Sequence, residues 1–210
     1  MKSIHITIVA LLACMSLQAQ KVQKNFTFTN LQEALDNAEE VIRLDLSNQT
    51  LDFSKVPFEQ FKNLEYLSLK DDKLSSFPEA ILELENLRIL DLSGNDFERL
   101  PENFFQLQKI EELYLNNDQK LNVERTVLQL SKLPNLSSLH LEGDRIKKLP
   151  SEMVNLKKLK FLYLTNNELE DIPLFLMDLE QLKFLDIQDN AIPKIKIQEY
   201  DPKGNIEVKF

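Results

Sequence analysis

A leucine-containing phrase recurs seven times along this chain of 210 residues, and its spacing constrains the fold more than any other feature. The phrase has the pattern L-x-x-L-x-L-x-x-N-x-L, and NLRILDLSGNDFERLP at residues 86–101 contains one copy. The copies start at Val41, Leu64, Leu87, Ile110, Leu136, Leu159 and Leu182. Successive starts are 23 residues apart, except for one step of 26 residues after Ile110. A fixed period of this length predicts a solenoid in which each repeat forms one turn.

The alternation inside the phrase predicts the local structure of each turn. Its x-L-x-L-x portion places leucines on one face of a short strand. Stacked turns should then form a parallel sheet with strands about 4.8 Å apart. In the third repeat, Leu100, Phe104 and Leu107 have the spacing of a helical or 3₁₀ return, and Pro101 fixes φ where that return begins. A single repeat buries too little apolar surface to fold alone, so we expect one cooperative domain.

These phrases resemble the leucine-rich-repeat family over residues 41–193. The Leu/Phe/Ile-Pro pairs at 77–78, 100–101, 149–150 and 172–173 are similar to its 23-residue "typical" class, found in Ras-suppressor-like and many bacterial proteins. The resemblance implies an α/β fold, a short horseshoe-shaped solenoid with a concave parallel sheet. It also implies a non-catalytic recognition scaffold that binds a protein or peptide on that sheet.

The fourth repeat departs from the pattern because it lacks the proline and is three residues longer. Its segment 124–132 predicts a helical bulge on the outer face, and either sequence drift or a contact loop would account for it.

The first residues, MKSIHITIVALLACMSLQAQ, predict a signal peptide over 1–19. Lys2 gives a basic start, residues 4–13 form an apolar run too short to span a membrane, and Ala19 is a small residue at the cleavage site. We therefore expect export to the periplasm, cell surface or medium of a Gram-negative bacterium. Two alternatives remain: lipidation of Cys14, which ends a lipobox-like sequence and would anchor the chain to a membrane, or a cytosolic protein that keeps this segment.

Both ends of a solenoid expose apolar surface that needs a cap. Residues 20–40 are expected to form a linker and a helical cap, because Thr29-Asn30 before LQEALDNAEE predicts an N-capped helix. The apolar face of this helix consists of Leu31, Ala34, Leu35 and Ala38. Residues 194–210 alternate on both sides of Asp201-Pro202-Lys203-Gly204, which favours a hairpin that caps the last repeat.

The asparagine position of the phrase forms a structural column along the solenoid. It is occupied by Gln49, Asp72, Asn95, Asp118, Asp144, Asn167 and Asn190. An asparagine there donates and accepts hydrogen bonds between adjacent turns, whereas an ionised aspartate only accepts. Asp118 and Asp144 would be neighbours, so we expect burial and like charge to raise both pKa values and to lower stability at high pH.

The outward side chains of the strands form the candidate binding surface. They include Tyr66, Ile89, Asp91, Tyr114, His140, Phe161, Tyr163, Phe184 and Asp186. Aromatic anchors with a polar rim are typical of protein interfaces, and the aspartates favour a basic partner. Aromatic residues are also favourable in any strand, so the same residues are expected in a sheet without a partner.

Composition and motifs disfavour other functions. The formal net charge is -9, which disfavours nucleic-acid binding, and three glycines leave no material for a phosphate-binding loop. The sequence has no H-E-x-x-H, C-x-x-C or G-x-G-x-x-G motif, so we expect no enzyme, no metal and no cofactor. An exported glycan binder would stack sugars on Tyr114, Tyr163 and Phe161, and a cytosolic signalling scaffold would keep its N-terminus. The sequence does not set an oligomeric state.

Overall fold

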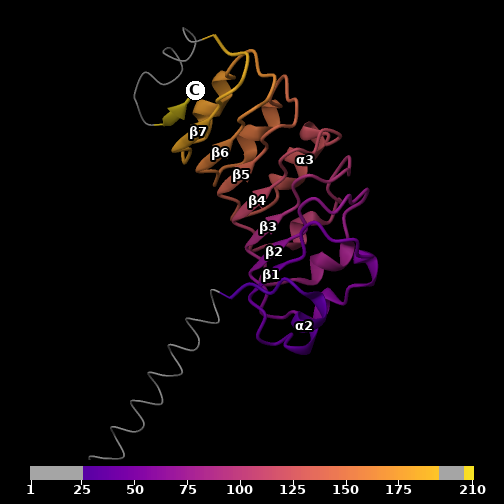
Figure 1. Ribbon diagram of the computed structural model, residues 1–210. Coiled ribbons are helices and arrows are strands. Elements are labelled where there is room, and N and C mark those ends of the chain that lie inside the picture. Colours follow the sequence, from indigo (N-terminus) through magenta and orange to yellow (C-terminus); the bar gives the residue numbers. More distant parts are fainter. Residues whose placement is uncertain (1–25, 194–205) are drawn as a thin grey trace, which may run out of the picture.

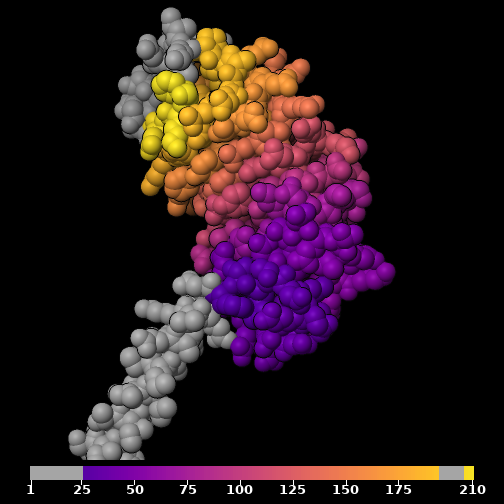
Figure 2. All heavy atoms as spheres, in the orientation of Figure 1, coloured from indigo at the N-terminus to yellow at the C-terminus, as the bar shows by residue number. Residues whose placement is uncertain are grey.

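A computed structural model describes residues 26–193 and 206–210 of the chain. The predicted signal peptide over 1–19 with Cys14, and the first arm and turn of the predicted C-terminal hairpin, lie outside the described residues. The chain winds through successive turns that carry strands on one side and short helices on the other (Figure 1). The sequence colours follow one another as bands along the molecule in Figure 2, because each repeat packs mainly against the repeats beside it.

The strands form a single eight-stranded sheet in the order β1-β2-β3-β4-β5-β6-β7-β8, and every neighbouring pair is parallel. The strands are β1 (Arg43–Asp45), β2 (Tyr66–Ser68), β3 (Ile89–Asp91), β4 (Glu112–Tyr114), β5 (Ser138–His140), β6 (Phe161–Tyr163), β7 (Phe184–Asp186) and β8 (Glu207–Lys209). Their central residues align in register, from Leu44 through Leu113 to Val208. The predicted leucine-rich-repeat solenoid with a parallel sheet is confirmed.

The return segments are mostly 3₁₀ turns, as the apolar spacing predicts. They are η1 (Phe53–Lys55), η2 (Phe58–Gln60), η3 (Glu79–Glu83), η4 (Phe104–Gln106), η5 (Ser151–Asn155) and η6 (Leu174–Asp178). Pro78, Pro150 and Pro173 occupy the N-cap positions of η3, η5 and η6. Leucines from the strands and phenylalanines from the returns, including Phe58, Phe61 and Phe104, meet in one continuous apolar core.

The longer fourth repeat replaces the 3₁₀ turn with the α-helix α3 (Val123–Leu130). The Asn122 side chain caps this helix by accepting a hydrogen bond from the Arg125 N–H. The extra residues therefore complete two helical turns, and Val127 and Leu130 are buried in the common core. The helix packs between η4 and η5, on the side of the returns (Figure 1).

The N-terminal helix is shorter than its apolar pattern predicts. The helix α2 spans Leu31–Asp36, with Asn30 as its cap, and the residues from 37 to 40 form turns. Asn37 ends the helix by donating its side-chain N–H to the Glu33 carbonyl. Acidic residues beyond that point are unfavourable at a helix C-terminus. Phe28 extends the sheet by bonding to both sides of Leu44, through the Arg43 carbonyl and the Asp45 N–H.

The structural column ties each turn to the next through backbone groups. Asn95 and Asn167 donate their side-chain N–H groups to two leucine carbonyls each, at 2.6–2.9 Å. Their Oδ1 atoms accept backbone N–H groups from the preceding repeat. The residue before the column adopts a positive φ in every repeat, and Gly94 and Gly143 take this position where other repeats use asparagine or aspartate.

The column aspartates make only half of these contacts. The Oδ1 atoms of Asp72, Asp118 and Asp144 accept backbone N–H groups of the preceding repeat at 2.6–2.7 Å. Their Oδ2 atoms are buried without a hydrogen-bond partner among the described residues. Burial, with smaller contributions from nearby acidic groups, raises the pKa of these carboxyls to about 6, about 8 and about 7, respectively.

Candidate functional site

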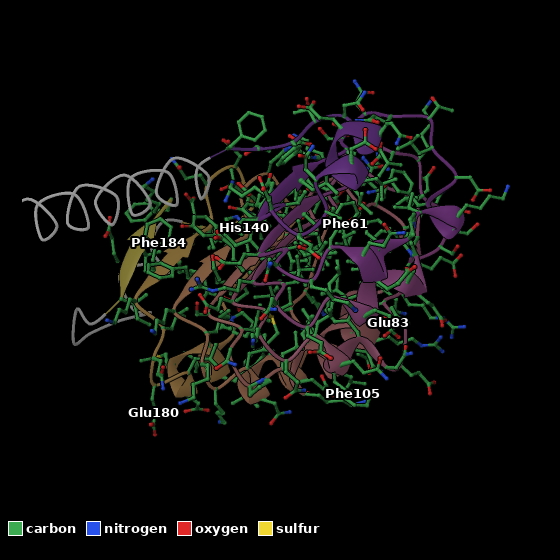
Figure 3. All side chains as sticks on the ribbon, turned by 90° about the horizontal axis from the view of Figure 1, so that it is seen from below. Phe61, Glu83, Phe105, His140, Glu180 and Phe184 are labelled. Carbon is green, nitrogen blue, oxygen red and sulfur yellow. The ribbon has the colours of Figure 1, made fainter. Side chains whose placement is uncertain are left out.

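The candidate site is the outward face of the strands, on the side opposite the short helices. His140 and Phe184 lie on the strand side in Figure 3, whereas Phe105 and Glu180 lie on the side of the returns. Parallel, in-register pairing brings outward residues of neighbouring repeats directly beside one another. Tyr114, His140 and Tyr163 therefore meet across β4, β5 and β6.

These three side chains form an aromatic stack. The ring centroids of Tyr114 and His140 are 3.9 Å apart with an interplanar angle of 18°. The His140 and Tyr163 rings are 4.1 Å apart and 6° from parallel. Phe184 continues the row at 5.3 Å from Tyr163, tilted by 48°. The imidazole of His140 is therefore enclosed between two phenol rings, and this residue is only 7% exposed.

Polar groups hold the edges of the His140 ring. Its Nε2 lies 3.1 Å from Glu112 Oε1 and 3.2 Å from Ser138 Oγ. Its Nδ1 lies 3.5 Å from Glu142 Oε2. The Tyr114 hydroxyl donates to the same Glu112 Oε1 at 2.7 Å. The ring stack is thus fixed by a hydrogen-bonding network as well as by packing.

This network sets the ionisation of its members. The hydrogen bond with His140 is the main cause that holds the pKa of the Glu112 carboxyl below its usual value. Burial, reinforced by the Glu112 charge, raises the pKa of the Tyr114 phenol above its usual value. At neutral pH the centre of the sheet therefore presents an ionised carboxylate beside neutral phenols.

The predicted residues nearer the N-terminus continue the outward columns, and Asp91 is the in-register neighbour of Tyr114. The Arg43 guanidinium lies 4.0 Å from the centre of the Tyr66 ring, so one ring face is already covered. Ile89 is the in-register neighbour of Tyr66 on β3. Asp91 Oδ1 accepts the Ser93 N–H at 2.9 Å and so stabilises the turn that follows its strand.

Two of the predicted site residues are less accessible than the alternating pattern suggests. Asp186 is 7% exposed, its Oδ1 accepts the Gln188 N–H, and its Oδ2 lies 3.9 Å from Lys209 Nζ on β8. His140 is enclosed in the ring stack. In contrast, Phe161 is 38% exposed and stands free of the stack.

Sequence reasoning missed Glu112, Ser138 and Glu142 as members of this site. All three occupy outward columns. Their positions beside the aromatic residues could have indicated them, because Glu112 and Ser138 pair in register two residues before Tyr114 and His140. Ser138 also forms the floor of a pocket of about 280 Å³, lined by Glu111, Glu112, Ser137, Ser138, Phe161 and Tyr163.

An adjoining hollow of about 390 Å³ shares Glu111 and Ser137 with this pocket and is also lined by Lys158 and Lys160, whereas the other hollows lie away from it. A wider one of about 860 Å³ is lined by loop and return residues of the second and third repeats, including Phe77, Arg99 and Glu102, with Lys120 from the fourth. Within residues 26–193 and 206–210, no cluster of three or more histidine, cysteine, aspartate or glutamate side chains is arranged to hold a metal ion. In the same described part of the chain, no helix has the length and apolar character needed to cross a bilayer.

Comparisons with known proteins agree with this geometry. A family model described as a leucine-rich repeat region matches residues 34–138, and another described as a leucine rich repeat matches residues 134–192. A leucine-rich-repeat protein of Leptospira interrogans is similar in structure, with a TM-score of 0.56 and 26% identity, over 88% of this chain and 58% of that one. No curated protein matches the sequence.

Two further solved structures share the fold. An internalin of Listeria monocytogenes is 21% identical, with a TM-score of 0.63. The match covers 84% of this chain and 50% of the internalin chain. A chain in the structure of the Drosophila Toll–Spätzle complex is 20% identical, over 80% of this chain and 23% of that one, with a TM-score of 0.63. The chain spans between 23% and 58% of the length of these three structures.

Proposed function

The chain belongs to the leucine-rich-repeat family, and on this premise we propose that its concave sheet binds a protein or peptide partner. Members of this family commonly act as non-enzymatic scaffolds for protein interactions. The observation that carries the proposal is the stack of Tyr114, His140 and Tyr163, held in place beside the exposed ring of Phe161. Aromatic side chains with a polar surround are the usual anchors of protein interfaces.

The fixed geometry of the stack supports binding. Each ring is held by its neighbours and by the Glu112 network, so little side-chain freedom remains to be lost when a partner docks. The strands beneath are hydrogen-bonded on both sides and present these residues on a rigid sheet. Rigid aromatic anchors give contact area at low entropic cost.

The same geometry favours a protein over a glycan. A sugar would stack on an open ring face. In this stack, His140 covers one face of Tyr114 and one face of Tyr163, and the two tyrosines cover both faces of His140. The ring edges and hydroxyl groups of the stack suit hydrogen bonding and edge contacts with a polypeptide.

The proposal extends to location. We expect the N-terminal segment to direct export, with cleavage near Ala19, and the alternatives are lipidation of Cys14 and a retained cytosolic N-terminus. The intact mass of the protein purified from its host distinguishes the three outcomes, because each leaves a different first residue or adds a lipid.

The binding test is a cross-linking capture from the native host with wild type and the Tyr114→Ala/Phe161→Ala/Tyr163→Ala variant. The matched control is Phe105→Ala/Leu128→Ala/Met177→Ala, which removes three exposed apolar side chains from the side of the returns. We expect the concave variant alone to lose a partner that wild type captures, while both variants keep a cooperative melting curve. A partner retained by the concave variant and lost by the control would place the interface on the opposite side.

A further inference from the structure

We propose that the pocket above Ser138 accepts a single arginine or lysine side chain of the partner, and we call it the Ser138 pocket. It is lined by Glu111, Glu112, Ser137, Ser138, Phe161 and Tyr163. This inference rests on the proposed function, because it assigns the partner's chemistry at one point of the same concave sheet.

A small residue in a column of large ones creates the pocket. Ser138 pairs in register with Glu112 on β4 and with Phe161 on β6. Ser138 is 8% exposed and forms the floor, while its longer neighbours stand on either side. The resulting volume of about 280 Å³ is below the range usual for small-molecule sites and suits one long side chain.

The two walls are complementary to a cation. On one side, Glu112 uses Oε1 to bond Tyr114 and His140, while its Oε2 forms no hydrogen bond with any described residue. On the other side, the Phe161 and Tyr163 rings line the pocket. A carboxylate facing an aromatic wall favours a guanidinium, which forms charge-assisted hydrogen bonds and stacks on rings.

The sheet already holds two of its own cations over aromatic rings. Arg43 lies 4.0 Å above the Tyr66 ring near one end of the sheet. At the other end, Lys209 Nζ lies 5.4 Å from the Phe184 ring centre and 3.9 Å from Asp186 Oδ2. The Ser138 pocket lies between these two ends and combines a ring with a carboxylate, as the Lys209 site does, and no described basic side chain lines it.

The carboxylates near the pocket favour the same ligand, although Lys158 and Lys160 line the adjoining hollow that shares Glu111 and Ser137. Glu142 lies on the far side of His140, and the chain carries a net charge of -9. Glu111 at the pocket rim is already paired with Arg88 at 2.8 Å, so Glu112 is the carboxylate left to receive an incoming cation. A basic segment of the partner would be drawn to this part of the sheet.

The direct test is an NMR titration of the full chain with N-acetyl-arginine amide, using N-acetyl-citrulline amide as the neutral isostere. We expect saturable shifts at Ser138 and Phe161 with the arginine probe in the millimolar range, and much smaller shifts with citrulline. Glu112→Gln should weaken binding by at least about tenfold, because a hydrogen bond to a charged group is lost. Equal responses to the two probes, no response, or an unchanged affinity in Glu112→Gln would overturn the proposal.

Two variants separate the pocket from its surroundings. Glu142→Gln removes the same charge beside the same histidine but lies outside the pocket, so it should retain binding. Ser138→Leu fills the pocket and leaves Glu112 in place, and the sheet accommodates larger residues in this column at Phe161 and Phe184. We expect Ser138→Leu to abolish the arginine response while its melting curve stays cooperative.

The same variants in the capture experiment distinguish this inference from the proposed function. A partner lost by the triple concave variant but retained by both Glu112→Gln and Ser138→Leu would uphold concave binding and refute the cation pocket. A partner retained by the triple variant would refute concave binding, and the arginine titration would then decide the pocket by itself.

Discussion

In the structural column, one side-chain atom, an amide nitrogen or a carboxylate oxygen, determines whether the stability of a repeat depends on pH. Asn95 and Asp118 accept similar backbone hydrogen bonds, but only the amide has an N–H group to offer the leucine carbonyls. The buried Asp118 Oδ2 remains without a partner among the described residues, and a carboxylate there is costly. Burial raises the Asp118 pKa most, and Asp144, Asp91 and Asp96 raise it further.

The residue-scale prediction is that Asp118→Asn stabilises the protein at high pH. The folded pKa of about 8 exceeds the ordinary value of 3.8, so the contribution of Asp118 to stability is full below 3.8 and is lost as pH rises through the folded pKa. Asparagine does not titrate and restores the missing donor. We expect the variant to gain roughly 1–3 kcal/mol near pH 9, or about 3–10 °C in Tm, and much less near pH 5.

Thermal melts at several pH values provide the measurement, with Asn95→Asp as the matched reverse substitution in the preceding repeat. Asn95→Asp should lower Tm, and increasingly so as pH rises. A Tm difference between Asp118→Asn and wild type that stays constant across this pH range would contradict the account.

At the scale of elements, the strands of the repeats turn one face to the core and the other to the proposed binding surface. Leu113 points into the core from β4, whereas its neighbours Glu112 and Tyr114 are outward and partly accessible. The central leucines of β1 to β7 are all fully buried, whereas the outward residues of these strands range from buried to exposed. Outward residues that are partly accessible can therefore vary with little effect on the core.

The element-scale prediction compares the two faces directly. Leu113→Ala should destabilise the protein by roughly 2–5 kcal/mol, because it leaves a cavity among fully buried side chains. Ile89→Ala on the outward face of β3 should cost about 1 kcal/mol, because its side chain is only partly withdrawn from water. Urea unfolding measures both, and similar losses for the two variants would show that the faces are not separated in this way.

At the scale of the whole molecule, the repeats share one core. Buried apolar residues run continuously from Phe28 to Ile187, and the sheet passes through every repeat without a break. The helix α2 lies beyond the first repeat and the strand β8 pairs with β7 after the last. No described repeat is set apart by a break in the sheet or the core.

The whole-molecule prediction is a single unfolding transition. Leu44→Ala in β1 and Leu162→Ala in β6 should each lower the midpoint of that same transition, although they lie far apart in the solenoid. Calorimetry provides the measurement, since the calorimetric and van't Hoff enthalpies agree for a two-state process. A second transition in either variant would reveal two halves that unfold separately.

The sequence was sufficient to predict the solenoid, the strand positions and the outward columns. A period of 23 residues and strict alternation within each phrase leave one arrangement that buries the strand leucines of every repeat. It was insufficient for the length of α2, which ends at Asp36 because Asn37 caps it and acidic residues follow. Local helix propensity and capping determined where α2 ends, and the spacing of apolar residues contains no information on either.

For the proposed binding surface, too, the sequence determined one part and the tertiary structure another. Periodicity alone determines which residues face outward, because side-chain direction in a strand follows position. Only the tertiary structure decides what these residues do to one another, because their neighbours come from repeats more than twenty residues away. Stacking encloses His140, pairing with Lys209 withdraws Asp186, and the small side chain of Ser138 opens a pocket between Glu112 and Phe161.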